Sequence, residues 1–247
     1  MRYFIEIAYN GKNYFGWQIQ PEQISVQETV EKALSTLLRD DIKIMGAGRT
    51  DAGVHAKQLF AHFDANPIHN PSDLVFRLNS FLPSDIAIRS IKKVSEDAHA
   101  RFDATKREYE YYIVLHKDPF WEGLAYQLYR TPDMRKMNEA AKSLLDYEDF
   151  QCFSRSNTDV KTYTCKVTKA EWRREGERLI FHIEADRFLR NMVRAIVGTL
   201  LDVGYGKTTM PQFHEILKSK DRGLAGASAP AHGLYLTRVH YPEDLFR

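Results

Sequence analysis

The spacing of apolar residues divides the first hundred residues of this chain into short strands and helices. Apolar and polar positions alternate over residues 3–8, which predicts a strand. Ser25 and Glu28 form a capping-box pattern, and apolar residues recur behind them at helical spacing as far as Leu38. The same reading predicts helix 72–81 and strands 42–45, 58–64 and 86–94. The predicted order is β-α-β-β-α-β.

A polar stretch, residues 95–105, leads into a second half with a similar order. Its predicted elements are strand 108–115, helix 134–145, a hairpin of strands 161–172 and 178–184, helices 188–203 and 211–218, and strand 234–241. We therefore predict an α+β protein with two ferredoxin-like (βαββαβ) units, residues 1–100 and 101–247. Their antiparallel sheets are expected to join into one wide sheet, with an active-site cleft between the units.

The net charge of the chain says little about its partners, and the distribution of charged residues says more. The 247 residues carry 35 Lys and Arg against 33 Asp and Glu, a net charge of +2, which excludes a uniformly basic protein. Residues 1–100 carry 11 basic and 12 acidic groups, and residues 101–247 carry 24 and 21. Any electrostatic attraction for a polyanion must therefore come from a local patch.

The two cysteines, Cys152 and Cys165, are too few for a disulfide scaffold and are expected to be buried free thiols. The N-terminal residues lack the features of a signal peptide. No apolar stretch approaches the ~18–20 residues that span a bilayer. We expect a soluble cytoplasmic protein without membrane contact.

The most unusual segment is GAGRTDAGVHA, residues 46–56. Its three glycines permit tight or left-handed backbone and the close approach of a ligand. Arg49 and Asp51 lie between them, so a guanidinium can keep a carboxylate ionised and oriented, and that carboxylate can act as nucleophile or base. A hairpin turn with Asp51 bonded to nearby amides is the structural alternative.

Other chemistries find little support. The segment lacks the P-loop pattern, and Gly206-Lys207-Thr208 has Leu201 where that pattern needs a glycine. Phosphoryl transfer on an aspartate would favour a second Asp at position 53, which is a glycine. His55, His62 and His69 recur every seven residues, which is not a ligand spacing, so no metal site is predicted.

Two segments of the second half favour nucleic acid. Tyr109 and Tyr111 alternate on one strand, where each is either ordinary sheet packing or a ring on which a base stacks. On the predicted helix 188–203 and just before it, Arg187, Arg190 and Arg194 share one face. That face is either solvated or pairs with Asp51 or with phosphates. Further basic residues flank the linker and dot the hairpin, so a cleft lined by them would bind a polyanion.

Several motifs together resemble the TruA-type tRNA pseudouridine synthases along nearly the whole chain. Asn10 stands where that family frequently has Asp. The matching segments are GRTDAGVHA (48–56), Y-N-G-x-x-Y-x-G-W-Q-x-Q (9–20), R-L-N-x-x-L-P-x-D-I (77–86), F-D-A (102–104), R-x-Y-x-Y (107–111), F-L-R-N-M-V-R (188–194) and A-P-x-x-G-L-Y-L (229–236). Residues 152–166 match only loosely.

The resemblance implies isomerisation of uridines to pseudouridine at positions 38 to 40 of the tRNA anticodon stem-loop, by a homodimer without metal or cofactor. It implies that Asp51 is the nucleophile, that Tyr109 stacks on the target uracil, and that Arg194 pairs with Asp51. Arg49 would help to handle the flipped nucleotide. From the basic face described above, we predict that Arg187 and Arg190 contact the substrate. Two alternatives stay open: a non-catalytic RNA-binding protein with two sheet platforms, and a metal-free hydrolase that uses Asp51 as its nucleophile.

Overall fold

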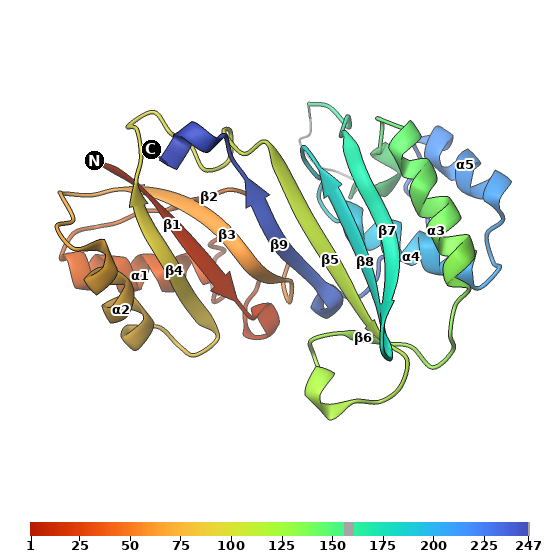
Figure 1. The fold of residues 1–247 in the computed structure, drawn as a ribbon, viewed down its shortest axis with the longest axis horizontal. Helices are drawn as coiled ribbons and strands as arrows, with labels where there is room; N and C mark the ends of the chain where they lie inside the picture. Colours follow the sequence, from red (N-terminus) through yellow and green to blue (C-terminus); the bar gives the residue numbers. More distant parts are fainter. Residues whose placement is uncertain (156–160, 247) are drawn as a thin grey trace. The chain divides into compact units, whose positions relative to one another are not determined.

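A computed structural model describes residues 1–155 and 161–246 of the chain, which form two compact units (Figure 1). Unit 1 holds Met1–Thr105 together with the C-terminal residues from Tyr235 onward, and unit 2 is Lys106–Leu234. The described residues contain five α-helices and nine strands, which confirms the predicted α+β class. None of these helices is long and apolar enough to cross a bilayer.

Unit 1 is built on a sheet with β1 at its centre. β1 (Arg2–Tyr9) pairs antiparallel with β3 (His55–Asp64) on one side and with β4 (Ile86–Lys93) on the other. The far edge of β3 is shared by two short pairings: β2 (Met45–Gly46) runs antiparallel to it near Ala61, and β9 (Leu234–His240) runs parallel to it at His55 and Ala56. The parallel pair departs from the antiparallel sheet that the sequence predicts.

Helices α1 (Val26–Leu38) and α2 (Pro71–Phe81) pack against each other, and α2 also packs on β4 (Figure 1). The Ser25 hydroxyl accepts from the Glu28 amide at 3.2 Å, so this half of the predicted capping box is confirmed. Pro71 opens α2, where its missing N–H leaves no bond unmade.

One face of the unit 1 sheet is buried, and the other is buried only in part, because Glu6 is half-buried there and Lys92 is exposed. The alternating residues Tyr3, Ile5 and Ile7 of β1 are inaccessible to solvent, as their spacing predicts. The other face carries an aromatic cluster in which the C-terminal segment folds back onto the sheet. Ring centroids in this cluster lie 5.4–6.4 Å apart; its members are Phe4, Phe60, Tyr241 and Phe246.

Unit 2 contains a three-stranded antiparallel sheet in the order β5-β8-β7, with bounds Lys106–Val114, Arg178–Ala185 and Val167–Glu175. A short strand, β6 (Tyr126–Gln127), runs parallel to the end of β5 and was not predicted. Helix α3 (Met134–Ser143) packs on β7 and on α4 (Met192–Gly204), and α5 (Met210–Ser219) lies beside α4 (Figure 1).

The two faces of the unit 2 sheet differ in chemistry. One carries large apolar residues such as Tyr111, Phe181 and Ile183, which are completely buried. The other carries a ladder of ion pairs across the three strands. Its closest ion pairs, 2.7–2.9 Å long, are Lys106–Glu184, Arg173–Glu110, Arg173–Glu175 and Lys169–Glu171, and His182 lies 2.9 Å from Glu184 beside them.

Three predicted elements end or begin at other residues than the spacing indicates. The strand predicted over 161–172 begins only at Val167, and the strand predicted over 42–45 shrinks to Met45–Gly46. The helix predicted from residue 188 begins at Met192, because Asn191 takes a left-handed conformation with φ of 68°. The remaining predicted helices and strands are confirmed with small shifts at their ends.

Candidate active site

The Asp51 segment lies in unit 1, outside the regular strands, between β2 and β3. The Val54 amide donates to the Asp51 carbonyl at 3.1 Å, which closes a turn with Asp51 at its first position. Gly53 occupies the third position with φ of 78°, a value that such a turn favours and that glycine adopts without strain. Asp51 is half-buried and Arg49 is exposed.

A second loop, residues 10–17, is moulded against this turn. The Gly53 amide donates to the Tyr14 carbonyl at 3.3 Å, and the Trp17 amide donates to the Thr50 carbonyl at 3.2 Å. A Cβ atom on Gly16 would lie 2.4 Å from the Thr50 oxygen, and Gly16 has a φ of 91°. Only glycine permits this approach of the two backbones.

The buried side of the turn is held by side chains of the same loop and of β1. The Tyr9 and Thr50 hydroxyls lie 2.8 Å apart and are both buried. His55, at the start of β3, accepts from the Gly11 amide through Nδ1 at 3.0 Å and stacks on Tyr235 with ring centroids 4.5 Å apart. This imidazole therefore ties the 10–17 loop to the start of β3.

The glycines of the segment serve different purposes. A Cβ on Gly46 would lie 2.6 Å from the Trp17 indole, so this glycine makes room for a buried ring. A Cβ on Gly48 would meet nothing within 4 Å. Of the three glycines that the sequence singles out, Gly46 and Gly53 are thus required by the fold, while the space beside Gly48 is open.

Sequence analysis missed the group that anchors the 10–17 loop from behind. The Asp85 carboxylate accepts from the Tyr14 hydroxyl at 2.6 Å and from the side-chain amide of Asn13 at 3.1 Å. The Asp85 backbone carbonyl accepts from the backbone amide of Asn10. Burial and the bond to Asp85 raise the pKa of Tyr14. The sequence held a clue to this contact, because Tyr14 belongs to the 9–20 motif and Asp85 to the 77–86 motif.

In unit 2, Tyr109 lies on β5 opposite Ile183 of β8 and is half-buried. Its ring lies edge-to-face with Phe188, with centroids 5.0 Å apart and planes at 85°. Phe188 was expected inside a helix; the structure places it outside any helix or strand, in the segment before α4. The edge-to-face contact holds the orientation of the Tyr109 ring.

Arg194 lies in the first turn of α4, where a neighbouring segment fixes it. Its Nε donates to the Ala229 carbonyl at 2.7 Å, and the Ala229 amide donates to the Arg194 carbonyl at 2.9 Å. A Cβ on Gly198 would lie 1.7 Å from the Ala227 oxygen, so only glycine lets this segment lie against α4. The motif that contains Ala229 is thus the support of the guanidinium stem.

Arg187, Arg190 and Arg194 do not share a helical face, which corrects the sequence prediction. Arg194 is helical, Arg190 lies in a turn, and Arg187 lies outside any helix or strand, with its backbone amide donating to the Asp186 carboxylate at 2.6 Å. The left-handed Asn191 separates Arg190 from α4. Arg190 is exposed, and its carbonyl accepts from the Arg155 amide at 3.0 Å.

One group among the described residues has the composition of a metal site. Ligand atoms of Glu108, His182 and Glu184 lie within 4.8 Å of one another. The Lys106 ammonium already lies 2.7 Å from Glu184 and 4.0 Å from Glu108, so a cation from the chain itself balances these carboxylates. We assign the group to the ion-pair ladder of unit 2.

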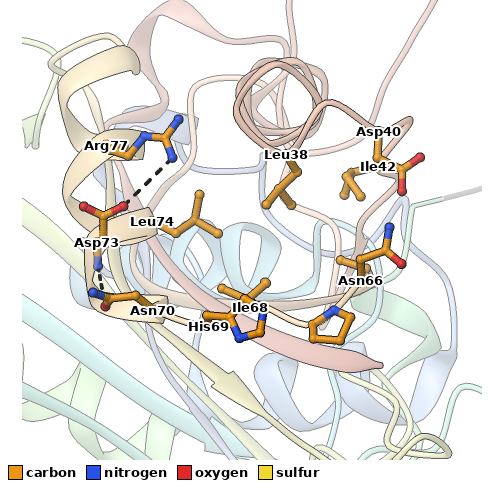
Figure 2. Close-up of a pocket in the computed structure, with 12 residues that line it drawn as sticks. Leu38, Asp40, Ile42, Asn66, Ile68, His69, Asn70, Asp73, Leu74 and Arg77 are labelled. Atoms are coloured by element: carbon orange, nitrogen blue, oxygen red, sulfur yellow. Dashed lines mark hydrogen bonds and ion pairs between the residues drawn. The ribbon is translucent and has the colours of Figure 1, made fainter.

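A hollow of about 270 Å³ opens in unit 1 between the end of α1 and the start of α2 (Figure 2). Its apolar lining includes Leu38, Ile42, Ile68 and Leu74. Arg77 lies 3.9 Å from Asp73 at its rim. None of the predicted site residues lines this hollow, so it is separate from the Asp51 turn.

The predicted site residues thus fall into two groups. Arg49 and Asp51 belong to unit 1, and Tyr109, Arg187, Arg190 and Arg194 belong to unit 2. Within unit 1 the structure builds a rigid turn around a half-buried carboxylate, and within unit 2 it builds an oriented aromatic ring and a tethered arginine. A carboxylate on a rigid turn suits covalent or acid–base chemistry, and the ring suits a planar base.

Comparison with known proteins shows what this arrangement is similar to. A family model described as tRNA pseudouridine synthase matches residues 6–103 and 140–242. The tRNA pseudouridine synthase A of Bacteroides thetaiotaomicron is 53% identical over 248 residues, which cover 99% of this chain and 92% of the relative. Proteins of the same name from Parabacteroides distasonis and Bacillus licheniformis are 54% and 42% identical, and each of these two matches covers at least 98% of this chain and of the relative.

The matched regions include the Asp51 turn, the 10–17 loop that supports it, and the Arg194 segment with its Ala229 partner. Tyr109 lies between the two parts of the family match but inside the near-complete matches to the relatives. Because the family model covers most of the chain and relatives more than 50% identical cover nearly all of it, the chain belongs to the tRNA pseudouridine synthase family.

Proposed function

We propose that this chain converts uridine to pseudouridine at positions 38, 39 and/or 40 in the anticodon stem-loop of tRNA. Its membership of the tRNA pseudouridine synthase family, over nearly the full length, carries this proposal. The substrate is then tRNA, and the enzyme is an isomerase. We also propose that the chain acts as a homodimer, as the resemblance implies.

The reaction needs no net transfer of electrons. The bond between uracil N1 and ribose C1′ breaks, the base turns over, and C5 bonds to C1′; C5 loses a proton and N1 gains one. We propose that Asp51 is the nucleophile of this reaction. It would attack the base or the sugar, or assist elimination at the sugar, while the uracil is detached from ribose C1′. A rigid turn supports this role, because a carboxylate that is held in place reacts without first being ordered.

The target uridine has to leave the base stack before any of these steps. We propose that Tyr109 stacks on the flipped uracil, and that Arg194 pairs with Asp51 and keeps it ionised. Arg49, exposed beside Asp51, would contact the flipped nucleotide. Arg187 and Arg190 would contact the phosphates of the stem-loop.

We infer that each half of the chain is one ferredoxin-like unit. In the first half, the order β1, α1, β2, β3, α2, β4 and the pairing of β1 with both β3 and β4 support this arrangement. In the second half, the order β5, α3, β7, β8, α4 and the sheet order β5-β8-β7 support it. The first unit would supply the nucleophile, and the second the stacking ring, the arginines and the dimer surface.

The test of the proposed function uses tRNA transcripts labelled with tritium at uracil C5. Formation of pseudouridine releases this tritium to water, and mapping of the modified residues gives their positions. We expect release in step with modification at positions 38 to 40. Tight binding of tRNA without any release would instead favour the non-catalytic RNA-binding alternative.

A further inference from the structure

We propose that Tyr9 is a positioning residue for Asp51, acting through the hydroxyl of Thr50. The inference deepens the proposed function, since it takes Asp51 as the nucleophile. The Tyr9 and Thr50 hydroxyls lie 2.8 Å apart, and Thr50 is the residue that directly precedes Asp51. The bond therefore fixes one side of the peptide unit from which the carboxylate projects.

The turn is held in place by contacts with other segments. The last residue of β2 is Gly46 and the first of β3 is His55, so the residues between them belong to no strand. Thr50 is held at its carbonyl by the Trp17 amide at 3.2 Å and at its side chain by Tyr9. Without the second bond Thr50 would keep its carbonyl partner but lose the contact of its side chain with β1, and we expect Asp51 to shift with it.

Tyr9 is itself a stiff support. It ends β1, the central strand of unit 1, and pairs there with Ala56 of β3 and Ile86 of β4. Its ring stacks on Trp17 with centroids 6.3 Å apart and planes at 29°, and only 4% of Tyr9 is exposed. Because Tyr9 is fixed on the central strand, the bond from its hydroxyl fixes Thr50 relative to the sheet.

The Thr50 hydroxyl depends on this bond. Thr50 is 9% exposed, so Tyr9→Phe leaves its hydroxyl buried with a bonding capacity that bulk water cannot readily satisfy. A displacement of about 1 Å at a reacting group can lower a rate by roughly 100-fold. The chemical step should therefore respond to this bond far more than the binding of tRNA does.

The test compares Tyr9→Phe and Thr50→Val with the conservative variant Thr50→Ser and with Tyr3→Phe as a matched control. Tyr3 lies on the same strand, is 2% exposed, and uses its hydroxyl to accept from the Ile68 amide at 2.9 Å, at the other end of β1. It reports what the loss of a buried tyrosine hydroxyl does to unit 1 in general. Thermal unfolding, tRNA affinity by filter binding and the single-turnover rate at saturating tRNA are measured for each variant.

We expect Tyr9→Phe and Thr50→Val each to lower the single-turnover rate by roughly 10- to 100-fold, with tRNA affinity unchanged within about 2-fold. The double variant should lose little more than either single one, because both remove the same bond. Thr50→Ser should keep a rate close to that of the wild type. Tyr3→Phe should lower the melting temperature by about as much as Tyr9→Phe and leave the rate unchanged.

The results of these variants separate failure of the inference from failure of the proposed function. If the wild type forms pseudouridine, Asp51→Asn does not, and Tyr9→Phe reacts as fast as Tyr3→Phe, then Tyr9 is ordinary core and the inference is wrong. The same holds if Thr50→Ser is as slow as Thr50→Val. If the wild type forms no pseudouridine at all, the proposed function is what fails.

Discussion

At the scale of single residues, the letters of the Asp51 motif have separate physical reasons. Thr50 bonds to Tyr9, Gly53 supplies the positive φ, and His55 accepts from the Gly11 amide. The side-chain oxygen of Asn10 accepts from the Lys12 amide at 3.1 Å, a bond that an aspartate at this position could also accept.

The proposed stacking role of Tyr109 gives a prediction at this scale. Tyr109→Leu should lower kcat by roughly 10- to 100-fold, since stacking of a base on an aromatic ring contributes about 1–3 kcal/mol. Tyr109→Phe keeps the ring and its edge contact with Phe188, so it should stay within a few-fold of the wild type. Steady-state kinetics and circular dichroism check both variants. Unfolding of the leucine variant would show that Tyr109 serves the core instead.

The sequence places the proposed site residues in recognisable motifs, but it does not predict what holds them. Asp51, Tyr109 and Arg194 all stand in such motifs, and their roles in the reaction stay predictions. The contacts of Asp85 with Tyr14 and of Ala229 with Arg194 join positions 71 and 35 residues apart in the chain. Local periodicity contains no information on such pairs, which only the tertiary fold creates.

At the scale of elements, close backbone approaches through glycine place the functional segments. Gly16 lets the 10–17 loop touch the Asp51 turn, and Gly198 lets residues 225–229 lie on α4. Gly226 continues the second contact, because its amide donates to the Thr199 hydroxyl at 2.9 Å. Each functional side chain is thus held by an element distant in sequence.

Gly198→Ala tests the second contact. Alanine favours a helix over glycine by about 1 kcal/mol, but the new Cβ would lie 1.7 Å from the Ala227 oxygen. We expect a loss of roughly 2–4 kcal/mol in unfolding free energy, measured with urea. Gly48→Ala, where a Cβ meets nothing within 4 Å, is the matched control and should change stability by less than about 0.5 kcal/mol. Stabilisation by Gly198→Ala would contradict the contact.

A buried imidazole ties β3 to the segment that follows β4. His62 Nδ1 accepts from the Ala100 amide at 3.1 Å, and burial lowers the pKa of His62 to about 4, with a smaller contribution from His99. The unfolded chain takes up this proton near pH 6.5. Stability is therefore complete above that pH and is lost as the pH falls toward 4.

We expect this loss to be on the order of 2 kcal/mol for His62, measured as urea unfolding between pH 7 and pH 4. His62→Asn keeps an acceptor for the Ala100 amide but does not titrate, so its profile should be flatter. His99 keeps its own lowered pKa in that variant, so some slope remains. Identical profiles for wild type and variant would exclude His62 as the cause.

The elements that the sequence predicts correctly are those whose burial is one-sided and regular. The helix 188–203 was predicted too long because Phe188 and Leu189 continue its apolar spacing, and periodicity alone does not reveal the left-handed Asn191. The parallel pairing of β9 with β3 escaped prediction for a related reason. It joins residues about 180 positions apart, and a strand pattern does not specify its partner.

At the scale of the whole molecule, the charge balance has a structural counterpart. Many basic residues that the sequence offers as RNA contacts are engaged with glutamates in unit 2. Arg173 lies 2.7 Å from Glu110, and Lys169 lies 2.8 Å from Glu171. The basic residues of this chain therefore do not all attract a polyanion. In the β7–β8 hairpin, neighbouring glutamates neutralise part of the positive charge, so the hairpin contributes less to RNA binding than its sequence suggests.

Salt dependence of tRNA binding tests this distinction. Arg190→Ala removes an exposed guanidinium that we assign to the substrate, so affinity should fall several-fold and the slope of log K against log salt should lessen by about 0.7–0.9. Lys169→Ala removes a charge that a glutamate already balances and should leave the slope unchanged. Filter binding over a salt series measures both. Equal slope changes in the two variants would mean that the ladder also binds RNA.

The central claim is that Asp51 performs an isomerisation on tRNA uridine, and tritium release measures it most directly. Wild type and Asp51→Asn are compared on the same C5-tritiated tRNA, with affinity determined in parallel. The account predicts release by the wild type, matched by pseudouridine at positions 38 to 40. It predicts no release by Asp51→Asn at unchanged tRNA affinity. Release by Asp51→Asn at the wild-type rate would contradict it.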